Sequence, residues 1–76
     1  MKPIMKYEYF DVYLYIEKPK TNIYILVSRH GDTLGEIRWW GSWRQYCFFP
    51  AEETVFSRGC LKDIQDFIES EMEKRK

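Results

Sequence analysis

Apolar and polar side chains alternate along the chain from Tyr7 to Ile16. Odd-numbered positions in this stretch carry four tyrosines and an aspartate, whereas even-numbered positions carry the apolar side chains Phe10, Val12, Leu14 and Ile16. A period of two is typical of a β-strand with one apolar face. We therefore expect a strand over residues 7–16, ended at Pro19 because proline cannot donate to the hydrogen-bond ladder.

A second strand is predicted over residues 21–28, with Ile23, Ile25 and Val27 on one face. His30-Gly31-Asp32 follows it and has the composition of a turn. The first two strands are therefore expected to pair in the antiparallel sense.

Two further strands are predicted at residues 34–40 and 43–49, joined by Gly41-Ser42. Glycine at the first central position favours a two-residue type II′ turn. That turn sets Trp40 opposite Trp43, and Trp39 opposite Arg44 as a cation–π pair. The more apolar face, assigned to the core, then carries Gly35, Ile37, Trp39, Arg44, Tyr46 and Phe48. The opposite face carries Glu36, Arg38, Trp40, Trp43, Gln45 and Cys47.

The last quarter of the chain predicts a helix over residues 58–74, with Ser57 as its N-cap. Asp63 and Asp66 near its start and Lys74-Arg75-Lys76 at its end suit the helix dipole. Apolar residues recur at helical spacing and predict its buried face: Cys60, Leu61, Ile64, Phe67, Ile68 and Met72.

These elements predict one domain over residues 1–76, an α+β fold in which a four-stranded antiparallel sheet is followed by one C-terminal helix. In this ββββα two-layer sandwich the helix covers one face of the sheet. The other face stays uncovered and carries several aromatic side chains.

Composition limits the classes of function. Twelve basic and twelve acidic residues balance in a chain of 76, which argues against holding polyanions by bulk charge. No apolar stretch approaches the roughly twenty residues of a membrane span, and the first residues have no apolar export segment. We expect a cytoplasmic protein that does not engage membranes.

Candidate chemistry is sparse. Cys47 and Cys60 do not form a Cys-x-x-Cys pair, and His30 is the single histidine, so one chain cannot supply a Cys/His zinc tetrad. Cys47 with His30 and Asp32 is the one triad-like set, and no glycine-rich phosphate loop exists. We expect reduced structural thiols, no metal, no cofactor and no enzymatic activity.

Four segments of the chain resemble a group of short uncharacterised proteins of bacterial, archaeal and phage genomes. They are Lys18-Pro19-Lys20-Thr21, Leu34-Gly35-Glu36-Ile37-Arg38-Trp39, Trp43-Arg44-Gln45-Tyr46-Cys47-Phe48-Phe49-Pro50 and Gly59-Cys60-Leu61-Lys62-Asp63-Ile64. The resemblance covers roughly residues 18–69. It implies a phage or mobile-element origin and no particular catalytic or binding residue. In architecture alone, four strands and a helix are similar to the transcriptional-coactivator family of single-stranded DNA binders, which dimerise and grip bases with strands.

A binding module is the favoured function, and a phage origin would make inhibition of a host or defence protein its expected use. Trp, Tyr and Arg are enriched in the hot spots of protein interfaces, and we expect the partner-binding residues to be Arg38, Trp40, Trp43, Gln45, Tyr13 and Tyr15. Two alternatives stay open: the same rings stack on single-stranded nucleic acid, or they serve only packing and self-association. A homodimer is expected, because such a sheet leaves a face or an edge unprotected.

Overall fold

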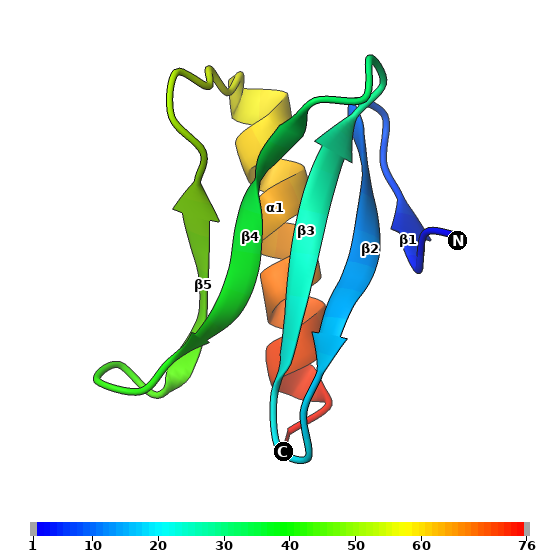
Figure 1. Ribbon diagram of the computed structural model, residues 1–76. Coiled ribbons are helices and arrows are strands. Elements are labelled where there is room, and N and C mark those ends of the chain that lie inside the picture. The colour runs from blue at the N-terminus through cyan, green and yellow to red at the C-terminus, as the bar shows by residue number, and fades with distance from the viewer. Residues whose placement is uncertain (1, 76) are drawn as a thin grey trace.

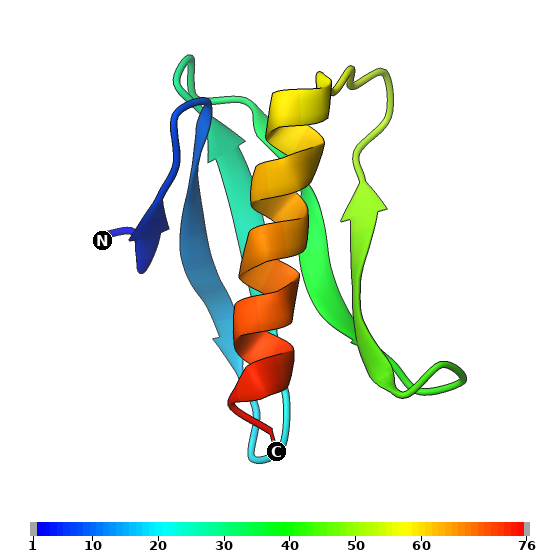
Figure 2. The ribbon, with the colours of Figure 1, turned by 180° about the vertical axis from the view of Figure 1, so that it is seen from behind.

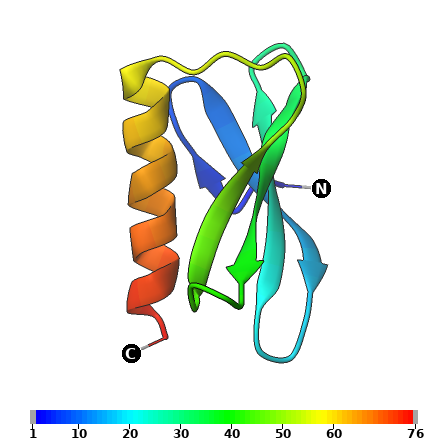
Figure 3. The same cartoon turned by 90° about the vertical axis from the view of Figure 1, so that its left-hand side faces the viewer.

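The computed structural model describes residues 2–75 and contains an antiparallel sheet with one helix packed on one face (Figure 1, Figure 2). In chain order the elements are β1 (Met5–Lys6), β2 (Phe10–Glu17), β3 (Asn22–Ser28), β4 (Thr33–Trp40), β5 (Gln45–Pro50) and α1 (Arg58–Glu73). Each strand pairs with its neighbours in sequence, so the sheet is a meander. The predicted α+β class and its two layers are confirmed, as the edge view shows (Figure 3).

The sheet has five strands, so the prediction of four was wrong by one. β1 comprises only Met5 and Lys6, which pair with Val12 and Asp11 of β2. Two residues are too few to show a period. Residues 7–9, expected to begin the first strand, form the connection between β1 and β2 instead, closed by a hydrogen bond of 2.9 Å from the Tyr7 amide to the Phe10 carbonyl.

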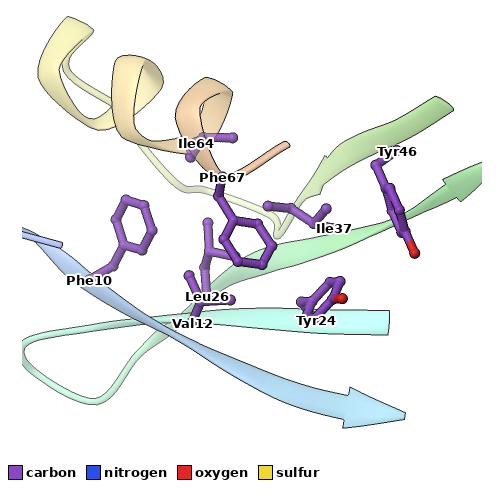
Figure 4. Close-up of a cluster of buried hydrophobic side chains, with 8 residues drawn as sticks. All are labelled: Phe10, Val12, Tyr24, Leu26, Ile37, Tyr46, Ile64 and Phe67. Atoms are coloured by element: carbon purple, nitrogen blue, oxygen red, sulfur yellow. The ribbon is translucent and has the colours of Figure 1, made fainter. Parts of the chain in front are cut away.

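The core lies between the sheet and α1 (Figure 4). Phe10 and Val12 of β2 are fully buried there, as the alternation predicts. On β3 the buried residues are Tyr24 and Leu26, so the neighbouring isoleucines and valine point away from the helix. The complete buried cluster consists of Phe10, Val12, Tyr24, Leu26, Ile37, Tyr46, Ile64 and Phe67.

A β-bulge in β2 changes the face of Ile16. The register between β2 and β3 shifts between Leu14 and Ile16, and Ile16 then pairs with Ile23. Paired residues share a face, so the extra residue places Ile16 on the side away from the helix. Ile16 is 42% exposed, and the expectation that it shares one face with Phe10, Val12 and Leu14 was wrong.

The hairpin between β4 and β5 has a four-residue loop, Gly41 to Arg44, in place of the predicted two-residue turn. Trp40 pairs with Gln45 and Trp39 with Tyr46, two residues beyond the predicted partners. The residue with left-handed backbone is Arg44, at φ 54°. A shift by two preserves which face each strand residue occupies, so the core assignments of Ile37, Trp39, Tyr46 and Phe48 hold, whereas Arg44 lies in the loop.

The Trp39 ring takes a different cation from the one predicted. The Arg75 guanidinium of the C-terminal segment lies 4.2 Å from the Trp39 ring centre, and the ring meets Tyr46 edge-on at 5.5 Å. The expected pair with Arg44 does not form. Trp39 is half-buried and packs against the core, as predicted.

The helix begins as predicted, since the Ser57 hydroxyl accepts a 3.2 Å hydrogen bond from the Cys60 amide. Its buried face differs at Leu61, which is 50% exposed. The first turn holds no acidic residue and the last no basic one. Asp63 and Asp66 therefore lie too far into the helix for the predicted dipole role, Lys74 is the C-cap residue, and Lys76 lies outside the described residues.

A buried carboxylate anchors the end of α1. Glu71 is only 7% exposed, and its Oε1 accepts a hydrogen bond from the Tyr24 hydroxyl. Its Oε2 is 2.7 Å from the Lys74 ammonium. Asn22 extends the network, because its side-chain amide donates to the Tyr24 hydroxyl at 3.2 Å and its backbone amide to the Tyr46 hydroxyl at 3.1 Å. Each polar group of this network therefore has a hydrogen-bond partner, as buried polar groups require. The network also connects the end of the helix to β3 and β5.

Gly35 should tolerate no side chain. A Cβ built there would lie 2.5 Å from the Phe49 carbonyl oxygen and 2.8 Å from Phe48 Cε1, at φ +155°. We expect Gly35→Ala to lower the free energy of unfolding by about 1–3 kcal/mol, measured by urea denaturation. Gly41→Ala is the control, because a Cβ there meets nothing within 4 Å. Equal stabilities of the two variants would contradict the close approach of β5 to Gly35.

Stability should fall at alkaline pH. Burial, followed by the hydrogen bond to Glu71, raises the pKa of Tyr24 well above its usual value. In the unfolded chain this hydroxyl ionises near pH 10. Its stabilising contribution is therefore complete below about pH 10 and is lost as the pH rises toward the folded pKa. Urea midpoints between pH 8 and 11 should fall less steeply in Tyr24→Phe. Tyr15→Phe, which removes an exposed hydroxyl, should keep the wild-type slope.

Candidate binding surface

The face of the sheet opposite α1 has no covering element among residues 2–75 (Figure 1, Figure 3). We call this surface the open face. Strand register and alternation assign to it Asp11, Tyr13, Ile16, Ile23, Ile25, Val27, Glu36, Arg38, Trp40, Gln45, Cys47 and Phe49. Most of these side chains are apolar or aromatic, and contiguous apolar surface of this kind marks interaction sites.

An aromatic cluster lies at the β4–β5 side of the open face, with Phe49 at its centre. The Arg38 guanidinium lies 4.3 Å from the Phe49 ring centre, and the Trp40 ring centre lies 5.8 Å from it. Trp43, from the hairpin loop, meets Trp40 edge-on at 6.2 Å. Trp40 is 41% exposed and Trp43 67%, so both rings offer apolar surface to a partner.

Local sequence explains why these side chains converge. Arg38 and Trp40 alternate with the core residues Ile37 and Trp39, so they must point away from the helix. Phe49 alternates in the same way with Phe48 on β5. The four-residue loop turns Trp43 back toward Trp40, with a 3.2 Å hydrogen bond from the Trp43 amide to the Trp40 carbonyl.

A cross-strand row links the cluster to the far side of the sheet. Tyr13 pairs with Ile25, Ile25 with Glu36, and Glu36 with Phe49. Their side chains are half-buried by one another, because directly opposed residues lie about 5 Å apart. The open face is therefore a continuous surface across four strands.

Charges on the open face are paired. Glu36 Oε1 lies 3.7 Å from Arg38 Nε, and Asp11 Oδ1, itself shielded from water, lies 2.7 Å from Arg29 Nη1. Arg29 also donates hydrogen bonds to the carbonyls of Tyr7, Glu8 and Phe10. Both arginines are thus engaged with groups of the protein itself.

The predicted site residues are only partly brought together. Arg38, Trp40 and Trp43 join one cluster, and Gln45 pairs with Trp40 at the start of β5. Tyr13 lies in the cross-strand row. Tyr15 lies at the bulge and is 59% exposed, away from the cluster.

Sequence reasoning missed Phe49, which is the centre of the cluster. Its alternation with Tyr46 and Phe48 was a sufficient signal. The exposed side of β3 was missed too, because its isoleucines and valine resemble core residues.

The one triad-like set that the sequence offers is not assembled. Cys47 pairs with Arg38, whereas His30 and Asp32 lie in the turn before Thr33, at the other end of β4. Thr33 and Arg38 are five positions apart along the strand, a distance of roughly 16 Å. The Cys47 thiol contacts the Gln45 carbonyl at 3.8 Å, and both cysteines are free.

The described residues contain neither a cluster of metal-ligating side chains nor a membrane-spanning helix. Between residues 2 and 75, no three His, Cys, Asp or Glu side chains gather in a way that could hold a metal ion. Within the same residues, no helix has both the length and the apolar composition needed to cross a membrane.

Comparison with known proteins identifies a phage relative. No family model matches the chain, and no solved structure matches it significantly. The chain is 43% identical over 59 residues to the "Uncharacterized 9.3 kDa protein" of Acholeplasma phage L2, a match that covers 78% of this chain and 76% of the relative. Identity at this level extends over most of both sequences, so the chain belongs to the same family of small proteins as the 9.3 kDa protein of this phage.

Proposed function

We propose that this protein is a non-enzymatic binding module whose open face binds a partner protein. The observation that carries the proposal is the exposed aromatic cluster of Arg38, Trp40, Trp43 and Phe49 on an uncovered, largely apolar sheet. Trp and Arg dominate the binding energy of protein interfaces. The cross-strand row from Tyr13 to Phe49 supplies the surrounding area that excludes water.

Charge pairing favours a protein over single-stranded nucleic acid. Nucleic-acid surfaces combine stacking rings with cations that are free to meet phosphates. On the open face Arg38 lies beside Glu36, and Arg29 is held by Asp11 and backbone carbonyls. A partner protein with a mixed apolar and polar surface suits this balance.

The phage relative supports a finer proposal about biological role. Its description gives a size and no activity. We propose that this chain is likewise encoded by a phage or mobile element and inhibits or redirects a host or defence protein in the cytoplasm. A small non-enzymatic domain would act most simply by occupying a surface of its target.

Substitutions in the cluster should separate binding from folding. We expect Trp43→Ala and Arg38→Glu to retain the melting temperature of the wild type and to release a protein captured from a lysate of the cell that carries the gene. Trp39→Ala should instead lower the stability by about 3 kcal/mol, because its ring packs against the core. Thermal melts and affinity capture at matched concentration measure the two effects.

Tyr9→Ala is the matched control for the capture, since Tyr9 is an exposed ring in the β1–β2 connection. The protein retained by wild type and Tyr9→Ala, but not by Trp43→Ala, is the partner. Retention should change little between about 50 and 200 mM salt, whereas nucleic-acid binding weakens steeply. Capture of nucleic acid alone would overturn the proposal.

We further propose that the chain forms a homodimer through the free edge of β2. β1 covers only Asp11 and Val12, so the part of β2 from Tyr13 onward has no neighbouring strand on that side among residues 2–75. The opposite edge is better protected: Pro50 has no amide hydrogen, and the outward Tyr46 amide donates to Met72 Sδ at 3.4 Å. Unpaired strand edges favour pairing between copies.

Light scattering should therefore give a mass near twice 9.4 kDa at micromolar concentration. Ile16→Lys places a charge on the free part of β2 and should yield the monomer, while Trp43→Ala should keep the dimer. A monomeric wild type would refute self-association, and a dimer lost in Trp43→Ala would move the interface to the open face.

A further inference from the structure

A shallow groove of about 320 Å³ lies on the helix side of the molecule, away from the open face. It is lined by Trp39 and Arg44 of the β4–β5 hairpin and by Met72 and Arg75 at the end of α1. Its volume falls in the range of sites for small molecules. The groove is independent of the binding function proposed above.

Two positive charges and no negative one line this groove. Glu71, one position before Met72, does not line the groove: it is buried and paired with Tyr24 and Lys74. Arg75 is held in place, because its guanidinium lies over the Trp39 ring and Nη1 donates to the Lys20 carbonyl at 2.7 Å. Its remaining N–H groups are available to a ligand.

Arg44 supports the inference independently. Its backbone has φ 54°, a conformation in which glycine is the favourable residue and a side chain costs stability. Its guanidinium makes no described contact with residues 2–75. An arginine in strained backbone that lines the same groove as a second arginine suits a ligand better than a role in folding.

We propose that this groove binds a phosphate monoester that carries an aromatic group. The two guanidinium forks match a phosphate dianion in charge and geometry. Trp39 and Met72 provide a ring and a thioether, which are favourable neighbours of an aromatic group. This chemistry occurs in a free nucleoside monophosphate and at the 5′-phosphorylated end of a nucleic-acid strand.

Titration of the full chain with adenosine monophosphate, followed by two-dimensional ¹H–¹⁵N NMR, tests the proposal. We expect the indole signal of Trp39 to shift, with those of Trp40 and Trp43 unmoved, and no shift with adenosine alone. Arg44→Gly should weaken binding about tenfold or more while its melting temperature equals or exceeds that of the wild type. Loss of affinity in a variant at least as stable cannot come from unfolding.

Arg58→Gln is the charge-matched control, since Arg58 lies at the opposite end of α1. It should bind as the wild type does. Tighter binding of a 5′-phosphorylated hexanucleotide than of its 5′-hydroxyl form would identify a strand end as the source, and preference for the mononucleotide would identify the free ligand. An unmoved Trp39 signal at millimolar ligand, or equal weakening in Arg44→Gly and Arg58→Gln, would overturn the proposal.

Discussion

One helix must cover a sheet that is wider than the helix, and this constraint shapes the rest of the molecule. α1 has 16 residues, about 24 Å, and a diameter near 10 Å with its side chains. Five strands at a spacing of about 4.8 Å span roughly 19 Å. The helix therefore protects only the middle of one face, as Figure 2 shows, and the chain must protect the flanks by other means.

Aromatic rings protect both flanks of the helix. On the β2 side Tyr7 packs against Phe10 at 5.1 Å and donates a hydrogen bond to Asp66 at 3.0 Å. On the β5 side Phe56 meets Phe48 edge-on at 5.2 Å. The aromatic side chains on the helix side of the sheet thus have a structural explanation. The exposed rings of Trp40 and Trp43 do not share it, because they lie away from the helix.

Side-chain alternation predicted the faces of the strands better than their pairing. The error in the β4–β5 loop shifts the partners by two residues, and because the side-chain period is also two, Trp39 and Trp40 keep their predicted faces. The bulge after Leu14 adds one residue instead, so Ile16 changes face. A bulge leaves no clear mark in the hydrophobic pattern, which is why this exchange could not be foreseen.

The hydrophobic pattern of the sequence could not predict buried polar residues or partners that are far apart in the chain, for a different reason. From the sequence alone, a glutamate such as Glu71 is expected at the surface. It is buried because Tyr24, 47 positions away in the chain, lies beside it and donates a hydrogen bond. Arg75 likewise pairs with Trp39 only once the helix lies along the sheet. Spacing within one element cannot express contacts that depend on how two elements pack. For the same reason the groove could not be predicted, because two of its lining residues come from the β4–β5 hairpin and two from the end of α1.

The unequal edges of the sheet set a limit on how far copies can add to one another. If two chains join through β2, the strands left outermost in the pair are the two β5 strands. There Pro50 has no donor to offer, and the Tyr46 amide is already taken by Met72. A third copy would find few free amide donors on the outer edge of β5, so such a sheet would not extend beyond two chains. With β2 paired in this way, the β5 edges would disfavour extension of the dimer into fibres.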